Sequence, residues 1–221
     1  MLNKFSWKEL VVLLIALLPG VYLYHIYPSL PPTIPTHFGL SGKPDGYGGK
    51  ETLIYTTVLL VGLALGLYLL IKFLPSIDPK KTAGLSATTF QKIAVGLVIF
   101  LTAINILTMY ASVAGSFNFT RLLFPLMGLF FIYIGNLMHS LKPNYFVGIR
   151  LPWTLEDPDN RRVTHQLGGK LWVAGGLAVT FCTLVLPART AGILFLILIS
   201  LMVIIPVVYS YRYFKKTNQP K

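Results

Sequence analysis

Apolar runs bounded by charged residues or by Gly and Pro clusters recur along almost the whole chain. Six of them lie at residues 10–27, 53–74, 93–114, 122–139, 171–186 and 191–211. A helix of roughly 20 apolar residues crosses the hydrocarbon core of a bilayer, and inside that core a helix satisfies all its own backbone hydrogen bonds. The pattern therefore predicts an all-α, polytopic integral membrane protein with six transmembrane helices.

Two polar segments between these runs are longer than a turn. The first, residues 28–50, is rich in Pro and Gly, and its Pro44-Asp45-Gly46 tripeptide predicts a turn after an extended stretch. In the second, residues 140–170, Asp157-Pro158 is typical of a helix N-cap followed by Pro at the first helical position. We expect a short helix to begin there and to meet the fifth span at a hinge formed by Gly168-Gly169.

The distribution of charge predicts the orientation of the chain. Its 221 residues are 54% hydrophobic and only 12% charged, yet the net charge is +12. A soluble nucleic-acid binder would be far more polar, so we expect no direct contact with nucleic acid. Of the 19 Lys and Arg residues, only Lys43, Lys50, Arg121 and Arg189 fall on one side of the six spans. The positive-inside rule then places both termini and residues 140–170 in the cytoplasm, and residues 28–50 outside a cell membrane.

The chain divides into two parts on this pattern. Residues 1–75 would form an N-terminal part of two spans that flank the extracellular loop at 28–50. Residues 76–221 would form a second part of four spans with the cytoplasmic loop at 140–170.

The polar chemistry inside the predicted spans is neutral. All seven Asp and Glu residues fall in loops or at span ends, and no Lys or Arg lies mid-span. Charged side chains within the membrane usually mark proton relays, ion coupling or buried catalytic sites. Thr102, Asn105 and Thr108 are most simply interpreted as hydrogen-bonding between helices, while Asn136 and His139 could instead line a polar pocket.

Catalytic and metal-binding motifs are absent from the sequence. It contains no nucleophile elbow, Walker loop or dinucleotide fingerprint, and its four His residues lack ligand spacing. We therefore predict no enzyme activity, no catalytic residues, no cofactor and no metal.

Two segments resemble a known family. The string Gly148-Ile149-Arg150-Leu151-Pro152-Trp153-Thr154-Leu155, followed by Thr164-His165, is similar to the signature of the SdpI-like family of polytopic membrane proteins. The Pro- and Gly-rich segment around His37 resembles the small domain of unknown function that precedes this signature in many members. One departure is Arg161, which stands where members commonly carry Trp.

The resemblance implies a membrane protein that protects the cell against a secreted toxic peptide. In the family's namesake it also implies a relay that holds a cytoplasmic repressor at the membrane. The expected partner residues in and beside the cytoplasmic loop are Asn136, Asn144, Gly148, Arg150, Pro152, Trp153, Thr154, Thr164 and His165. Those of the extracellular loop are Pro35, His37, Gly42, Pro44, Gly46 and Lys50.

A different class of function stays open on the sequence. A small transporter without ion coupling, or a lipid-handling protein, could use the polar end of the third and fourth spans. The lipid bilayer is a partner on either interpretation.

Overall fold

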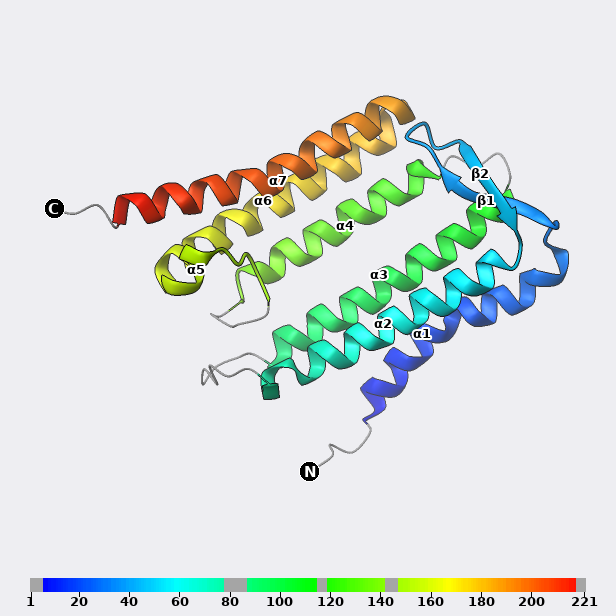
Figure 1. Ribbon diagram of the computed structural model, residues 1–221, viewed down its shortest axis with the longest axis horizontal. Helices are drawn as coiled ribbons and strands as arrows, with labels where there is room; N and C mark the ends of the chain where they lie inside the picture. The colour runs from blue at the N-terminus through cyan, green and yellow to red at the C-terminus, as the bar shows by residue number, and fades with distance from the viewer. Residues whose placement is uncertain (1–5, 78–86, 115–118, 142–146, 218–221) are drawn as a thin grey trace. The chain divides into compact units, whose positions relative to one another are not determined.

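The computed structural model describes residues 6–77, 87–114, 119–141 and 147–217 (Figure 1). Asn144 lies outside these residues. Six long helices carry most of the described chain: α1 Trp7–Ile26, α2 Thr52–Ile77, α3 Ala87–Ala114, α4 Thr120–Met138, α6 Pro158–Val185 and α7 Ala188–Thr217. Each is long and apolar enough to cross a membrane, which confirms the prediction of six spans.

Four short elements complete the secondary structure of the described residues. A 3₁₀ turn at Tyr27–Ser29 follows α1, and α5 at Pro152–Glu156 precedes α6. Strands β1 Thr33–Phe38 and β2 Pro44–Gly49 form an antiparallel hairpin between α1 and α2.

Two compact units make up the chain. Unit 1 contains Met1–Leu70 and Ala94–Leu123, and unit 2 contains Ile71–Ile93 and Phe124–Lys221. The division of the sequence into parts 1–75 and 76–221 stays a prediction.

The turn of the hairpin in unit 1 lies earlier in the chain than the sequence predicts. Pro44-Asp45-Gly46 was expected to make the turn, but it forms the start of β2. The chain reverses earlier, where the Gly39 N–H donates to the Lys43 carbonyl and Gly42 adopts a φ of 74°. Because positive φ is accessible to glycine without steric cost, Gly42 is the residue that permits this turn.

A small apolar core holds the hairpin to the helices of unit 1. Ile34 of β1 is fully buried and packs with Leu23, Leu30, Leu53 and Met109. Burial of this kind ties a two-stranded ribbon, which is marginal alone, to a larger body.

Neutral polar side chains join the helices of unit 1. Thr57 Oγ1 of α2 donates to Asn105 Oδ1 of α3 at 3.3 Å, and Thr102 Oγ1 of α3 donates to the Ile15 carbonyl of α1 at 3.4 Å. These bonds confirm interhelical hydrogen bonding for Thr102 and Asn105. Thr108 bonds within its own helix, to the Asn105 carbonyl.

Glycines hold α4 and α6 of unit 2 in close contact. A Cβ on Gly135 would lie 2.9 Å from the Gly169 carbonyl oxygen, and one on Gly128 would lie 2.7 Å from the Gly176 carbonyl oxygen. The expected hinge at Gly168-Gly169 is wrong, because α6 runs unbroken through both residues. Their small size serves helix packing instead of bending.

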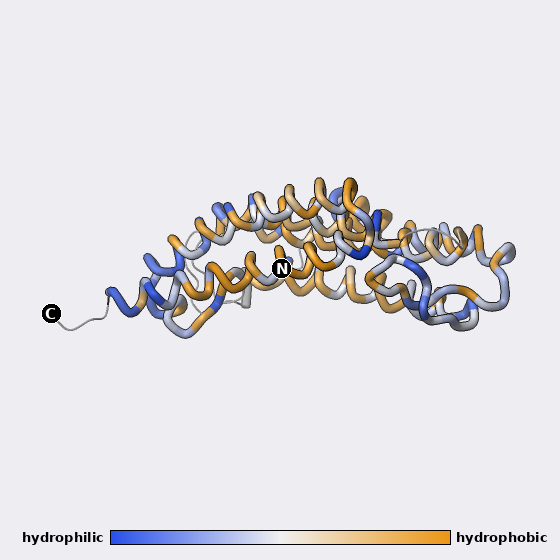
Figure 2. The backbone as a smooth tube through the Cα atoms, turned by 90° about the horizontal axis from the view of Figure 1, so that it is seen from above, coloured by the Kyte–Doolittle hydropathy of each residue, from blue (hydrophilic) through white to orange (hydrophobic). Residues whose placement is uncertain are grey.

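Large apolar side chains cover the outer faces of the helices. Phe181 is 70% exposed and Leu59 is 69% exposed. At most 39% of the most hydrophobic window of any span is buried within the chain. Figure 2 shows the hydrophobic residues along the helices, with hydrophilic residues at the hairpin and beside α5. Lipid is the solvent that such a surface requires.

Candidate functional site

The first candidate site, named here the α5–α6 site, comprises residues 147–165 and the end of α7 that they contact. Asp157 ends the α5 turn and begins α6, because its carboxylate accepts hydrogen bonds from the N–H groups of Asp159 and Asn160 at 2.9 and 3.0 Å. Pro158 follows at the first helical position. The predicted N-cap is therefore confirmed, and it fixes where α6 leaves the loop.

His165 holds the loop against α6. The Ile149 N–H donates to His165 Nε2 at 2.8 Å, and the His165 side chain is buried. This bond requires an unprotonated Nε2, so Nδ1 carries the proton of the neutral ring. Gly148 has a φ of 112°, and a Cβ there would lie 2.4 Å from His165 Nε2. The structure thus brings together two residues that the sequence singled out separately.

Thr154 organises the short helix α5. Its Oγ1 accepts from the Leu151 N–H at 2.9 Å and lies 3.0 Å from the Leu151 carbonyl oxygen. The side chain is 1% exposed. Thr154 therefore closes the turn from inside and is not available to a partner.

Trp153 attaches α5 to the end of α7. Its Nε1 donates to Ser210 Oγ at 3.0 Å, and its ring lies beside Tyr211 and Phe214 with centroids 5.2 and 6.2 Å away. An aromatic side chain with a polar edge suits this position at the border of an apolar helix.

Two buried hydrogen bonds that share the Asn160 side chain join α6 to Ser210 of α7. Asn160 Nδ2 donates to the Ser210 carbonyl at 3.0 Å, and Thr164 Oγ1 donates to Asn160 Oδ1 at 3.1 Å. All three residues are fully buried. Asn160 and Ser210 were not among the expected site residues. Asn160 could have been found from the sequence, because Asn160 and Thr164 are four positions apart and share one face of a helix. Ser210 could not, because it lies 50 positions from Asn160 in the chain.

Arg161 faces the loop. Its Nη2 donates to the Val147 carbonyl at 3.0 Å, and the side chain is only 4% exposed. At this position the chain thus has a buried cation that binds backbone.

The remaining expected residues lie at the surface of unit 2. Arg150, Pro152 and Asn136 are exposed. A cavity of about 350 Å³ lies between the end of α4 and the start of α6, and its lining includes His139, Arg161 and His165. Asn136 is not among its lining residues.

The second candidate site is the hairpin of unit 1. His37 binds the Asp45 carboxylate through Nδ1, across the two strands. Lys50 Nζ lies 4.6 Å from the centre of the Tyr27 ring. Gly46 packs against His37, since a Cβ on Gly46 would lie 3.0 Å from the His37 Cβ. Asp45 was not among the expected residues, although it lies within the Pro44-Asp45-Gly46 motif.

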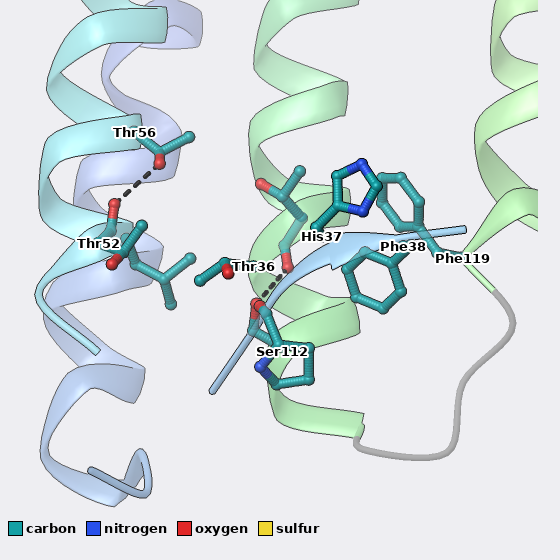
Figure 3. A pocket seen from close by; sticks show the side chains of 10 residues that line it. Thr36, His37, Phe38, Thr52, Thr56, Ser112 and Phe119 are labelled. Atoms are coloured by element: carbon teal, nitrogen blue, oxygen red, sulfur yellow. Dashed lines mark hydrogen bonds between the residues drawn. The ribbon is translucent and has the colours of Figure 1, made fainter. Parts of the chain in front are cut away.

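A cavity of about 220 Å³ lies between β1 and the helices α2 and α3. Figure 3 shows Thr36 of β1 between Thr52 of α2 and Ser112 of α3, with Phe38 and Phe119 close together. Ser112 Oγ of α3 lies 3.2 Å from the Pro35 carbonyl oxygen, so α3 and β1 are in contact beside the cavity.

Metal ligands do not gather at either site. Within the described parts of the chain, no group of three or more His, Cys, Asp or Glu residues could hold a metal ion.

The helices, their apolar faces and the two polar sites define a polytopic α-helical membrane protein. Residues 140–210 match the SdpI/YfhL protein family, and residues 14–62 match the domain of unknown function DUF1648. Over residues 140–210 the chain is thus similar to the SdpI/YfhL family, and with its six spans it is a multi-pass protein of the plasma membrane.

A curated relative matches over nearly the whole length. The chain is 24% identical to the immunity protein SdpI of Bacillus subtilis (strain 168) over 211 aligned residues. The aligned region covers 96% of this chain and 98% of the relative. No solved structure matches the chain.

Proposed function

We propose that this chain is an immunity protein, which protects its cell against a secreted toxic peptide and relays the presence of that peptide to a cytoplasmic partner. The observation that carries the proposal is the relation to an immunity protein over 96% of the chain. No catalysis is part of this function.

The proposal assigns the two sites to opposite sides of the membrane. Three candidate spans, α2, α3 and α4, separate the hairpin from the α5–α6 site. Because three crossings are an odd number, the two sites would lie on opposite sides of the membrane. The excess of Lys and Arg on the side of the α5–α6 site favours the cytoplasm for that site. The hairpin would then meet the peptide outside the cell.

The α5–α6 site supports the second half of the proposal by its construction. Its hydrogen bonds from Trp153 to Ser210 and from Ile149 to His165 hold the loop in one shape. Exposed side chains such as Arg150 and Arg162 stand on that scaffold. A fixed backbone with exposed cations suits recognition of a protein partner. Relay further requires that the peptide and the partner bias the same two states of the chain.

Deletion and restoration of the gene test the protective role. Cells without the gene should be killed by the peptide fraction that the parent strain secretes, and a plasmid copy should restore growth. The relay is tested with Arg150→Ala and Trp153→Ala. Both variants should still protect the cell, but a cytoplasmic partner should no longer co-purify with membranes that contain them. Unchanged sensitivity of the deletion strain, with no phenotype of either variant, contradicts the proposal.

A further inference from the structure

The cavity beside β1 is a second feature of the hairpin, and the proposed function does not yet explain it. It is lined by residues of β1, α2 and α3, together with Phe119. We propose that it anchors one aromatic side chain with a neutral hydrogen-bond donor, an indole or a phenol, of the toxic peptide. This inference rests on the proposed function.

The size of the cavity limits its occupant. Its volume is about 220 Å³. An apolar protein cavity of about 150 Å³ holds a benzene molecule, so this one has room for a single, somewhat larger ring system and not for a folded segment. Leu53 and Ser112 are each 5% exposed, whereas Thr36 and His37 are exposed. A side chain would therefore enter past the strand and reach a buried floor.

The apolar wall of the cavity favours a ring. Phe38 and Phe119 are stacked, with ring centroids 4.7 Å apart and planes 21° from parallel. Pro35 and Leu53 add further apolar surface. Aromatic rings gain from offset-stacked or edge-to-face contacts, which a third ring could make with this pair.

The hydroxyl groups of the cavity select for a donor. Thr56 Oγ1 donates to the Thr52 carbonyl at 2.8 Å, and Thr108 Oγ1 donates to the Asn105 carbonyl at 2.7 Å. Ser112 Oγ lies 2.9 Å from the Thr108 carbonyl oxygen and 3.2 Å from the Pro35 carbonyl oxygen, so it gives its one proton to one of these two. A hydroxyl group that has given its only proton can still accept through its lone pairs. These three residues therefore present acceptors to an occupant.

The charge of the lining favours a neutral occupant. The described residues that line the cavity include no Asp, Glu, Lys or Arg, and the carboxylate of Asp45 is already bonded to His37. Burying an ammonium group without a counter-charge is costly, whereas an indole N–H or a phenol O–H needs only an acceptor. The walls and the acceptors together match Trp or Tyr.

Binding of amino-acid amides to the full-length protein in lipid nanodiscs tests the chemistry. The probes are N-acetyl-tryptophanamide, N-acetyl-tyrosinamide and N-acetyl-phenylalaninamide, with binding measured by saturation-transfer NMR. We expect the first two to bind and the third, which lacks the side-chain donor, to bind about tenfold more weakly. Equal affinity for all three would overturn the inference.

Variants locate the binding. Ser112→Leu fills the cavity and should abolish binding of the Trp amide, while Ser200→Leu is the matched control, since Ser200 makes the same bond to its own helix, to the Leu196 carbonyl. Thr108→Val keeps the shape and removes one acceptor, which keeps the test decisive where Ser112→Leu fails to fold. It should weaken binding of the Trp amide and leave the Phe amide unchanged. Undiminished binding of the Trp amide to a folded Ser112→Leu protein, or to Thr108→Val, contradicts the proposal.

Protection assays separate this inference from the function on which it rests. Full protection by Ser112→Leu, in cells that the unaltered chain protects, overturns the anchor site and leaves the proposed function standing. If the unaltered chain gives no protection, the proposed function fails, and amide binding still decides whether the cavity accepts indoles and phenols.

Discussion

Gly148 is the residue at which backbone geometry and side-chain packing depend most directly on each other. Its φ of 112° is strained for any residue with a side chain, and His165 occupies the space that a Cβ would need. The hydrogen bond from Ile149 to His165 depends on this close approach. The loop of the α5–α6 site therefore tolerates only glycine at this position.

We expect Gly148→Ala to lower the free energy of unfolding by about 1–3 kcal/mol, because strained φ and steric overlap add. Thermal unfolding in detergent micelles measures the effect. Gly20→Ala is the control, since nothing lies within 4 Å of the Cβ position at Gly20. Equal melting temperatures for Gly148→Ala and Gly20→Ala would contradict this account of the loop.

Thr154 gives a second prediction at the residue scale. Thr154→Val keeps the volume but leaves the Leu151 N–H without its acceptor, so we expect a loss of about 1–3 kcal/mol. Thr217→Val removes a comparable hydroxyl bond, to the Tyr213 carbonyl, at an exposed position and should cost much less. Chemical denaturation of both variants provides the comparison, and similar losses would argue against a structural role of Thr154.

Some residues of the α5–α6 site could be predicted from sequence and others could not. Asp157-Pro158 is a local signal, because an N-cap and its helix are adjacent in the chain. The pairing of Asn160 with Ser210 is not local, since 50 positions separate them. The sequence also predicted Asn136 as a site residue, because it is a polar residue within an apolar run. That pattern does not show which way the side chain faces. It is exposed on α4.

At the scale of elements, α4 and α6 are held together by glycines spaced alike on both helices. Gly128 lies against Gly176 and Gly135 lies against Gly169. Apolar side chains gain little by leaving lipid for a protein neighbour, so close backbone approach supplies the attraction.

We expect Gly135→Ala to destabilise unit 2 by about 1–3 kcal/mol through overpacking. The added Cβ would lie 2.8 Å from the Trp172 Cβ and 2.9 Å from the Gly169 carbonyl oxygen. Gly66→Ala on α2, where nothing lies within 4 Å of the Cβ position, should be neutral or stabilising. Trp fluorescence during unfolding distinguishes the two, and a neutral Gly135→Ala would contradict the packing argument.

Hydropathy predicted the spans well because helix formation in lipid depends on composition alone. It did not predict the unbroken course of α6. A Gly pair suggests a hinge in water, but in α6 both glycines contact other residues of unit 2, and α6 stays regular. The hairpin turn was misplaced for a related reason. Pro44-Asp45-Gly46 has turn chemistry, yet Gly46 is paired with His37 across the strands.

At the scale of the whole molecule, the proposed function requires that the hairpin face the outside of the cell and the α5–α6 site face the cytoplasm. With Cys182 replaced by Ala, a single cysteine at Lys43→Cys should react with a membrane-impermeant maleimide on intact cells. Arg162→Cys should react only after the cells are permeabilised. Both positions are exposed, so access and not burial decides the result. The reverse pattern would contradict the proposed orientation.

Protection of the cell from a secreted peptide is the part of the proposed function on which the other parts depend. The most direct measurement is the lowest concentration of the purified peptide fraction that stops growth of a deletion strain, with and without a plasmid copy of the gene. We expect the plasmid copy to raise that concentration by about tenfold or more. Equal inhibitory concentrations, with the protein present in the membrane at normal levels, would contradict the claim.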